Sequence, residues 1–279
     1  DKSKQKDFYI QHELPTSNYK NYGNLSAVIK DYDEGKVSLP IVWKSAKFGY
    51  DGKGVKIIHS FDELQNLSDV PCLLEEKVKI KKEISVIVAR NQSKEEKCFP
   101  AVEMEFNDHS NLVEFIMCPA NISKELEEKA FDTALKTAKS FNIVGLLAVE
   151  LFITEDNEIL INEVAPRPHN SGHHTIECCL TSQFDQHIRS VLNLPLGNTS
   201  LKSPGIMVNL IGENEFEGNV KYENIEKILE IPGVSVHFYG KKKSRLNRKM
   251  GHVTIVHKDI NKAKKIGKKV KKLINVTSE

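Results

Sequence analysis

Apolar residues recur with two spacings along this chain, and each spacing predicts a different element. In residues 123–141 they fall every three or four positions, with glutamates early and lysines late, which predicts a helix packed on a core through one apolar stripe. Helical spacing also covers residues 5–14, ended by Pro15, and residues 25–32, 61–67 and 259–274. Short apolar or alternating runs such as EISVIVAR, LLAVELFIT, EILINEVA and GIMVNLIG predict strands between the helices. The pattern therefore indicates an α+β protein.

Residues 194–204, LPLGNTSLKSP, break both spacings and predict a linker. We expect a first domain over residues 1–195 and a smaller C-terminal lobe over residues 196–279. The last helix carries many lysines around Ala263, Ile266 and Val270. A helix on a membrane surface or a nucleic acid is an alternative, but the solvated face of a packed helix is the simpler interpretation.

Composition narrows the class of protein. The 279 residues carry 40 basic and 38 acidic groups, so the net charge of +2 gives no reason to expect nucleic acid or anionic lipid as a partner. No run of about 20 apolar residues predicts a membrane span. Five cysteines without a CxxC motif fit a reducing compartment, and we predict a cytoplasmic protein. The chain opens on DKSKQK without a methionine, so we expect that upstream sequence is missing.

Two apolar runs joined at Asp156 and Asn157 predict a hairpin that carries paired carboxylates. If a two-residue turn closes it, Thr154 faces Ile159 and Glu150 faces Glu163. Like charges directly opposite each other are destabilising, and a divalent cation such as Mg²⁺ between them removes the conflict. A slipped register, or carboxylates that reach water, is the alternative.

Other segments suggest anion binding. The loop GYDGKG exposes backbone N–H groups beside lysines, which suits a nucleotide phosphate, although YDGKG is also an ordinary hairpin tip. The chain has no Walker A or GxGxxG motif. Two of only five arginines fall in YGKKKSRLNRKMGH, and a third lies in PRPHNSGHHTIECC. The planar guanidinium binds phosphate and carboxylate groups well, so both segments are candidate anion sites.

Taken in order, these motifs resemble one family. Lys44 at a strand end, GYDGKG, EEKV followed by Glu83, AVELF, NEVAPRPHNSGH and YGK with RKMGH are similar to the 5-(carboxyamino)imidazole ribonucleotide synthases of the ATP-grasp superfamily. The resemblance covers nearly the whole chain. It implies an α+β ATP-grasp fold, in which two α+β lobes clasp ATP, with a small C-terminal mixed α/β lobe. The resemblance also implies an N-terminal α/β domain that helps to form a homodimer, and we expect that domain to be absent from this chain.

The resemblance also implies roles for individual residues. Those expected at ATP are Lys2, Lys44, Gly49, Tyr50, Gly52, Lys53, Gly54, Glu75, Glu76, Lys77, Val78, Glu83, His109 and Asn162. Glu150 and Glu163 would bind Mg²⁺. The residues expected at the ribonucleotide are Tyr50, Asp51, Lys241, Arg248 and Lys249. Bicarbonate and the carboxyphosphate made from it would be held by Arg167, His169 and Asn170, and Asp51 would join these three as a catalytic residue.

The implied reaction is the ATP-dependent carboxylation of 5-aminoimidazole ribonucleotide with bicarbonate. In this interpretation Ser171 and Gly172 open a helix whose N–H groups add to the anion pocket, and Cys178 and Cys179 are core thiols. Two other hypotheses stay open at this point. One is an ATP-binding module without turnover. The other is a zinc protein built on His169, His173 and His174, which Pro168, Gly172 and the lack of an HExxH motif disfavour.

Overall fold

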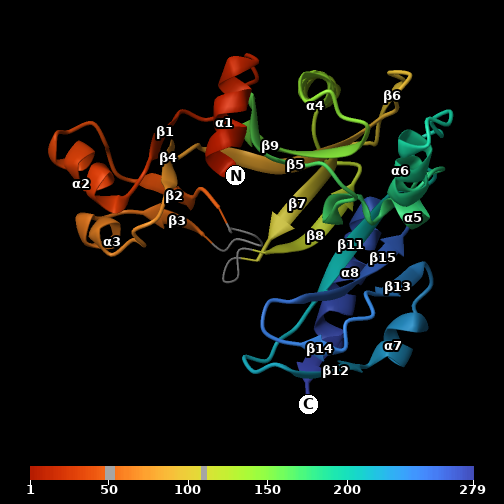
Figure 1. Ribbon diagram of the computed structural model, residues 1–279. Coiled ribbons are helices and arrows are strands. Elements are labelled where there is room, and N and C mark those ends of the chain that lie inside the picture. The colour runs from red at the N-terminus through yellow and green to blue at the C-terminus, as the bar shows by residue number, and fades with distance from the viewer. Residues whose placement is uncertain (48–53, 108–111) are drawn as a thin grey trace. The chain divides into compact units, whose positions relative to one another are not determined.

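The computed structural model describes residues 1–47, 54–107 and 112–279 (Figure 1). These residues form two compact units, one of residues 1–82 with 150–163, the other of residues 83–149 with 164–279. Each unit is described by itself. The domain boundary expected after residue 195 is a different division of the chain and stays a prediction. Six residues with predicted roles lie outside the described ranges: Gly49, Tyr50, Asp51, Gly52, Lys53 and His109.

The first unit is built on a four-stranded antiparallel sheet in the order β1-β4-β2-β3. Its strands are β1 (Tyr19–Tyr22), β2 (Ile41–Ser45), β3 (Val55–Ile58) and β4 (Cys72–Glu76). Helices α2 (Leu25–Asp33) and α3 (Phe61–Gln65) cover one face, where Val28, Leu64, Trp43 and Leu74 share a core. Because side chains alternate along a strand, Lys44 and Glu75 project from the opposite face, and helix α1 (Lys2–Gln11) contacts β4.

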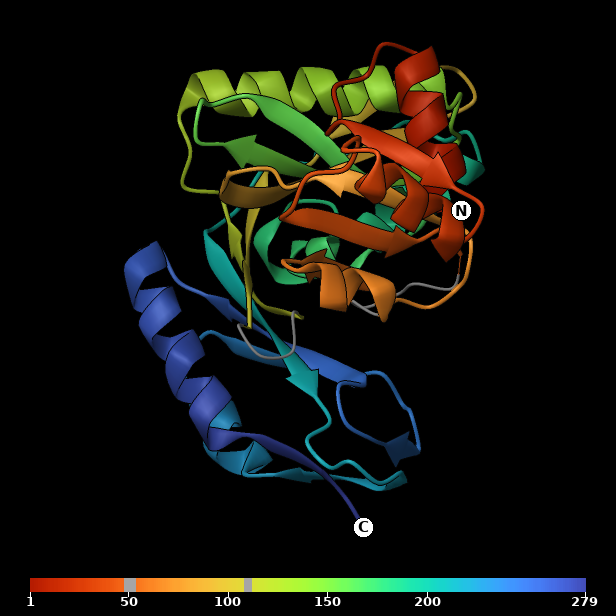
Figure 2. The ribbon, with the colours of Figure 1, turned by 90° about the vertical axis from the view of Figure 1, so that its left-hand side faces the viewer.

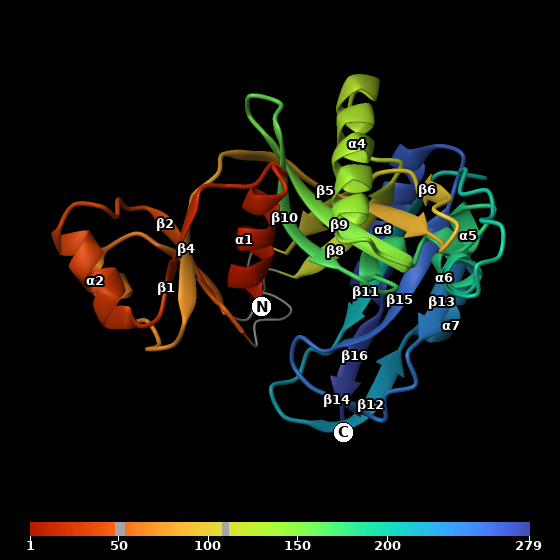
Figure 3. The ribbon, with the colours of Figure 1, turned by 45° about the horizontal axis from the view of Figure 1, so that its top comes forward.

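A hairpin completes the first unit. It joins the ends of β9 (Gly145–Thr154) and β10 (Ile159–Ala165), which are neighbours in their sheet (Figure 3). Glu150, Asn162 and Glu163 all belong to this part of the unit. The hairpin therefore brings the predicted metal ligands into the same unit as Lys2 and Lys44.

The second unit contains an antiparallel sheet of strands β5, β7, β8, β11, β15 and β13, with β6 paired to β5. The bounds are β5 (Ile80–Arg90), β6 (Glu96–Cys98), β7 (Val102–Phe106), β8 (Val113–Cys118), β11 (Gly205–Ile211), β13 (Val234–Phe238) and β15 (Lys249–Val256). Helix α8 (Ile260–Leu273) lies along β11 and β15 (Figure 2). Its Ala263 and Val270 join Ile206 and Val253 in one core, while its lysines stay outside, so the interpretation of this helix as a packed one is confirmed.

The remaining elements of this unit are short, apart from one long helix. They are α4 (Lys124–Ser140), the 3-10 turn η1 (Asn170–Gly172), α5 (Thr175–Cys178), α6 (Gln183–Val191) and α7 (Ile225–Leu229). Strands β12 (Gly218–Glu223), β14 (Lys243–Ser244) and β16 (Asn275–Ser278) form a small second sheet. Helices α4 and α8 match their predictions, since the first and last residues of each predicted segment are the caps.

Two predictions about helices were wrong. The first helix begins at Lys2 rather than residue 5, because the Asp1 side chain accepts a hydrogen bond from the Lys4 amide and caps it. The helix expected to open at Ser171 is only a 3-10 turn followed by the four-residue α5. A single turn has little dipole, so it adds little to an anion pocket.

None of the helices in the described ranges is long and apolar enough to cross a membrane. All five cysteines are free, as the sequence predicted, and Cys178 and Cys179 are buried.

Candidate active site

Three charged side chains form a buried cluster in the first unit. Glu75 lies between two lysines, with its Oε2 3.3 Å from Lys6 Nζ and its Oε1 3.0 Å from Lys44 Nζ. Their side chains are only 3% to 10% exposed. The Ser17 hydroxyl also donates to Glu75, over 2.8 Å, and Lys44 donates to Asn162 Oδ1 over 3.1 Å. The Lys44 ammonium group is therefore fixed from two sides.

The charges of this cluster are strongly coupled. Burial alone would raise the pKa of Glu75, but Lys44 and Lys6 together lower it, so the carboxylate stays ionised. Burial lowers the pKa of Lys6 to about 8, with Lys44 adding to the decrease and Glu75 opposing it. At neutral pH the cluster thus holds two positive charges against one negative charge, and its excess charge is positive.

Glu163 extends the cluster toward the hairpin. Its Oε2 lies 3.4 Å from Lys2 Nζ, and its side chain is 45% exposed. Burial raises the pKa of Tyr9, and the negative charges of Glu163 and Glu75 raise it further. One small pocket is lined by these residues of the first unit: Lys2, Gln5, Lys6, Lys44, Glu75, Asn162 and Glu163. The structure thus brings together five of the residues that the sequence predicted for ATP and metal: Lys2, Lys44, Glu75, Asn162 and Glu163.

The hairpin tip differs from its prediction by one residue. Asn157 donates to the Thr154 carbonyl and the Thr154 amide donates to the Glu158 carbonyl, so the turn holds three residues and Thr154 pairs with Glu158. Asn157 takes the left-handed conformation, with φ of 62°, that such a turn requires. The expected pairing of Thr154 with Ile159 was wrong.

The corrected turn shifts the expected register of the hairpin by one residue. Buried and half-buried residues alternate from Ile159 to Asn162, and Asn162 and Glu163 are both half-buried. The direct pairing of Glu150 with Glu163 stays a prediction.

The oxygen atoms near Glu163 suit a hard cation. Mg²⁺ prefers carboxylate and amide oxygens and commonly binds one or two carboxylates together with substrate phosphates. Glu163 and Asn162 supply such oxygens at the edge of the lysine pocket, and Glu150 lies half-buried on β9 of the same unit. The residue types that are present therefore fit the predicted metal.

The other described residues predicted for ATP lie outside this pocket. Glu76 is exposed and accepts a hydrogen bond from Asn18, and Lys77 and Val78 follow β4 without belonging to a strand. Gly54 has a φ of 80° and its carbonyl accepts from the Ser45 amide, which closes the β2–β3 connection next to Lys44. Glu83 belongs to the second unit, where it lies opposite Met104 on β7.

The second unit gathers the predicted bicarbonate residues in one loop, residues 166–173. Asn170 and Asn209 exchange two hydrogen bonds through their side-chain amides, of 2.8 and 3.0 Å. Asn209 is buried in β11 and also donates to the Val113 carbonyl, so it anchors Asn170 to the sheet. Arg167 is exposed, and its Nη1 donates to the Pro168 carbonyl. The loop thus presents a guanidinium group beside an anchored amide.

The basic residues predicted for the ribonucleotide belong to the same unit. Lys241 donates to the Lys249 carbonyl over 2.6 Å, and its ammonium group lies 5.5 Å from the ring centroid of Tyr239. Arg248 donates to the Lys243 carbonyl. Burial is the main cause that lowers the pKa of His173, and the positive charges of Lys249 and Arg167 lower it as well.

Three imidazole rings of the second unit form one stack. His252 lies between His173 and His237, at ring-centroid distances of 4.9 and 4.5 Å. His237 Nε2 lies 2.6 Å from the Glu177 carboxylate, and the Tyr239 hydroxyl lies 3.2 Å from His252 Nδ1. Burial, with smaller contributions from neighbouring basic side chains, lowers the pKa of His173 to about 4 and that of His252 to about 3. Both rings are therefore neutral at pH 7.

Acidification is expected to destabilise the fold through these histidines. Folding lowers the pKa values of His173, His174 and His252. Below about pH 6.5 these side chains therefore bind protons in the unfolded chain that they do not bind in the folded chain. The contribution of these histidines to the free energy of unfolding should be constant above pH 6.5 and fall by up to about 1.4 kcal/mol per pH unit per histidine between pH 6.5 and 4.

Urea denaturation at pH 7 and pH 5 measures this loss, and His252→Phe, which keeps an aromatic ring without a titrating group, should reduce it. An equal stability of the unaltered protein at both pH values would contradict the expected proton uptake.

The structure does not support a zinc site on the histidines. Within the part of the chain that the structure describes, no three His, Cys, Asp or Glu side chains are placed to hold a metal ion together. His174 is fully buried, and its Nδ1 lies 2.9 Å from the Ser171 carbonyl, to which it must donate.

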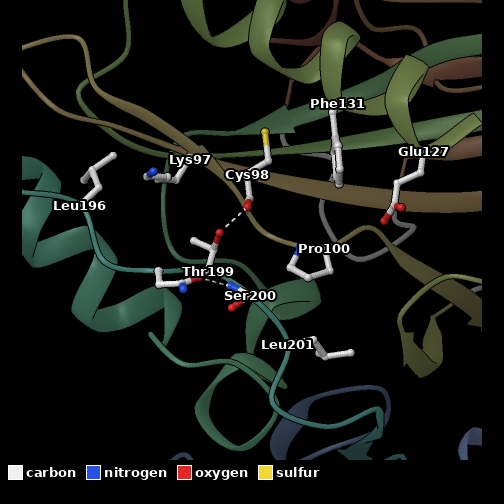
Figure 4. A pocket seen from close by; sticks show the side chains of 10 residues that line it. Lys97, Cys98, Pro100, Glu127, Phe131, Leu196, Thr199, Ser200 and Leu201 are labelled. Atoms are coloured by element: carbon white, nitrogen blue, oxygen red, sulfur yellow. Dashed lines mark hydrogen bonds between the residues drawn. The ribbon is translucent and has the colours of Figure 1, made fainter. Parts of the chain in front are cut away.

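A larger hollow lies elsewhere in the second unit. It has a volume of about 630 Å³ and is lined by β6, α4 and the 196–201 segment, including Cys98, Phe131, Leu196 and Thr199 (Figure 4). The Thr199 hydroxyl donates to the Cys98 carbonyl, and this hydrogen bond joins two sides of the hollow. None of the residues predicted for ATP, metal or substrate lines it, so it is not part of the candidate site.

Sequence reasoning missed two residues that organise the site. Lys6 follows Lys2 by one helical turn, and this spacing alone could have placed both on one face of α1. Asn209 is the one polar residue in the apolar run GIMVNLI, and a polar residue inside a buried strand is a signal for a specific hydrogen bond.

Comparison with known proteins gives the family of the chain. The model of the ATP-grasp domain matches residues 7–184, and that of the phosphoribosylaminoimidazole carboxylase C-terminal domain matches residues 205–266. The chain belongs to the ATP-grasp family. Within it, the chain falls among the N5-carboxyaminoimidazole ribonucleotide synthases, as the resemblance in sequence had implied, and the predicted fold is confirmed.

Three relatives give the extent of the similarity. The N5-carboxyaminoimidazole ribonucleotide synthase of Bacillus subtilis is 45% identical over 226 residues, which are 79% of this chain and 57% of that protein. The crystal structure of the Thermotoga maritima synthetase is 41% identical, with a TM-score of 0.88 over 99% of this chain and 71% of the other. The Aspergillus clavatus synthase, in complex with ADP and 5-aminoimidazole ribonucleotide, is 30% identical, with a TM-score of 0.82 over 94% of this chain and 69% of the other. This ATP-grasp chain thus spans little more than half of the curated Bacillus relative.

Proposed function

We propose that the protein carboxylates 5-aminoimidazole ribonucleotide with bicarbonate at the expense of ATP, and so acts as a carbon–nitrogen ligase in purine biosynthesis. The observation that carries the proposal is the pocket in which Lys44, fixed by Glu75 and Asn162, lies with Lys2 and Glu163. Its excess positive charge and its carboxylate suit a metal–nucleotide phosphate. The relatives named above support the substrates.

Lys2 and Lys44 would hold the phosphates of ATP in this proposal. Lys44 is held by Glu75 and Asn162, so little rearrangement is needed when the phosphates bind. Glu150 and Glu163, with the Asn162 amide, would hold Mg²⁺, which when bound offsets the charge of the phosphates. By the resemblance, the backbone of residues 75–78 would hold adenine, and Glu83 would bind the ribose hydroxyls.

Arg167, His169 and Asn170 would bind bicarbonate and orient it. A bicarbonate oxygen then attacks the γ-phosphorus of ATP, the bond to ADP breaks, and carboxyphosphate forms. Cleavage of its carbon–oxygen bond releases phosphate and carbon dioxide. The exocyclic amine of the ribonucleotide attacks the carbon dioxide and loses a proton, which gives the carboxyamino product.

Lys241, Arg248 and Lys249 would bind the phosphate of the ribonucleotide, because ammonium and guanidinium groups are the side chains that bind phosphate best. Tyr50 and Asp51, which the structure does not describe, are kept as substrate residues on the resemblance alone. We further propose that the protein acts as a homodimer, as the resemblance implies. Five free cysteines support a reducing compartment, for which we propose the cytoplasm.

Phosphate release from ATP tests the function. We expect release only when bicarbonate and 5-aminoimidazole ribonucleotide are both present. Tight ATP binding without release in any mixture would instead support an ATP-binding module without turnover.

A further inference from the structure

Helix α6 has an inverted pattern of burial. Its buried residues are polar, Gln183, Gln186 and Ser190, whereas Phe184 and Ile188 are 42% and 53% exposed. A buried amide costs free energy unless its hydrogen bonds are satisfied. The two glutamines must therefore have specific partners, and the partners of Gln183 lie in the loop predicted to bind bicarbonate.

Gln183 uses its whole side-chain amide on that loop. Its Oε1 accepts from the His169 amide over 2.8 Å, and its Nε2 donates to the His169 carbonyl over 2.8 Å. The same Nε2 lies 2.8 Å from His173 Nδ1. Both N–H bonds and the oxygen are thus occupied, and Gln183 pairs with the backbone of His169 as a neighbouring strand would.

The contact with His173 fixes the position of a proton. An amide nitrogen can only donate, so His173 Nδ1 must accept and the neutral ring carries its proton on Nε2. The ring stacks on His252, and the positive charges of Lys249 and Arg167 act on its pKa. The amide of Gln183 thereby sets which nitrogen of His173 is a donor.

Gly172 permits this close approach. A Cβ atom added at Gly172 would lie 2.6 Å from Gln183 Oε1 and 2.3 Å from Ile87 Cδ1. Both distances are far below van der Waals contact, so a larger residue at position 172 would displace the side chains of Gln183 and Ile87. The loop and the amide are therefore packed as one unit.

We propose that Gln183 is a positioning residue for the carboxylation site. It holds the backbone of His169 and the Nε2–H form of His173, so that Arg167, His169 and Asn170 keep the geometry that bicarbonate requires. The proposal rests on the function proposed above, because it takes this loop to be the bicarbonate site.

Gln186 provides a matched control on the same helix. It is also fully buried, accepts from the Gly197 amide over 2.8 Å and donates to the Gly197 carbonyl over 3.1 Å. Gln186 thus holds the backbone of Gly197 in the way that Gln183 holds the backbone of His169, but Gly197 lies in the 194–204 segment. Loss of either amide should cost similar stability, whereas only loss of Gln183 should affect bicarbonate.

The kinetic test compares Gln183→Leu with Gln186→Leu in the full-length protein. We expect kcat/KM for bicarbonate to fall roughly 100-fold in Gln183→Leu, the size of effect that misplacement of reacting groups produces, with KM for ATP unchanged. In Gln186→Leu, kcat/KM for bicarbonate should stay that of the unaltered protein, at a similarly lowered midpoint of thermal unfolding. Equal values of kcat/KM for bicarbonate in the two variants would overturn the proposal.

A second measurement does not depend on activity. Nitrogen-15 NMR of the histidine rings should show His173 protonated at Nε2, and in Gln183→Glu, where a carboxylate replaces the donor, it should show a proton at Nδ1. This isosteric variant also serves if Gln183→Leu does not fold. An unchanged His173 spectrum in Gln183→Glu would show that Gln183 does not set the protonated nitrogen of His173. If the unaltered protein does not use bicarbonate but the spectra change as expected, the role of Gln183 in positioning His173 stands and the proposed function fails.

Discussion

Replacement of Glu163 by glutamine should lower the rate of ATP cleavage by about 10³-fold or more, the effect of removing several kcal/mol of stabilisation by a metal ion. Glutamine keeps the shape of the side chain and an oxygen for Lys2, so the pocket should stay intact. It removes the negative charge that a divalent cation requires. The rate of phosphate release at saturating ATP and Mg²⁺ measures the effect, and circular dichroism checks the fold.

Glu158→Gln is the matched control for this prediction. Glu158 lies on the same hairpin and is exposed, and its hydrogen bonds to Thr154 use its backbone. The same loss of charge at this position should leave phosphate release unchanged. If Glu163→Gln retains the activity of Glu158→Gln, Glu163 does not bind the metal and the assignment of the hairpin is wrong.

Replacement of Glu75 by glutamine should lower the free energy of unfolding by about 3–5 kcal/mol, the usual cost of removing one partner from a buried ion pair. Lys6 and Lys44 are almost fully buried, and among the described residues Glu75 is the only acidic side chain that forms an ion pair with either of them. Both lysines would lose this negative charge. Lys6 already has a pKa of about 8, so in the variant it should give up its proton first, and the loss of stability should shrink as the pH rises. Urea denaturation at pH 7 and pH 9 measures both effects.

The neighbouring Glu76→Gln separates this effect from a general loss of charge. Glu76 is exposed and contacts Asn18, so its replacement should change the free energy of unfolding by less than about 0.5 kcal/mol. Similar stabilities of the two variants would show that the lysine cluster does not depend on Glu75.

Long periodic segments were predictable from the sequence, because their own residues determine them. Helices α4 and α8 combine an apolar stripe with a capping side chain, Ser123 or Asp259, and both ends could be predicted to the residue. Short strands were not. In β1, YKNY, only one residue is buried, and in β12, GNVKYE, none is, so neither has a hydrophobic pattern that reveals it.

The residues of the candidate site could be proposed from the sequence, but their geometry could not. Lys44, Glu163 and Asn170 were found from motifs, and the structure brings Lys44 and Glu163 into one pocket. The register of the hairpin was missed because Asn157 adopts a left-handed conformation, which lengthens the turn by one residue. The partners of Asn170 and His169, Asn209 and Gln183, come from distant segments, and nothing in the local sequence indicates such long-range hydrogen bonds.

The transfer of oxygen from bicarbonate to phosphate tests the proposed reaction most directly. Attack of bicarbonate on ATP leaves one bicarbonate oxygen on the phosphate when carboxyphosphate breaks down. Turnover in ¹⁸O-labelled bicarbonate, with ATP and 5-aminoimidazole ribonucleotide, should therefore give inorganic phosphate that carries one ¹⁸O atom per turnover, as measured by mass spectrometry. Phosphate that is released without ¹⁸O from bicarbonate, and with oxygen from labelled water instead, would show that the pocket around Lys44 only hydrolyses ATP.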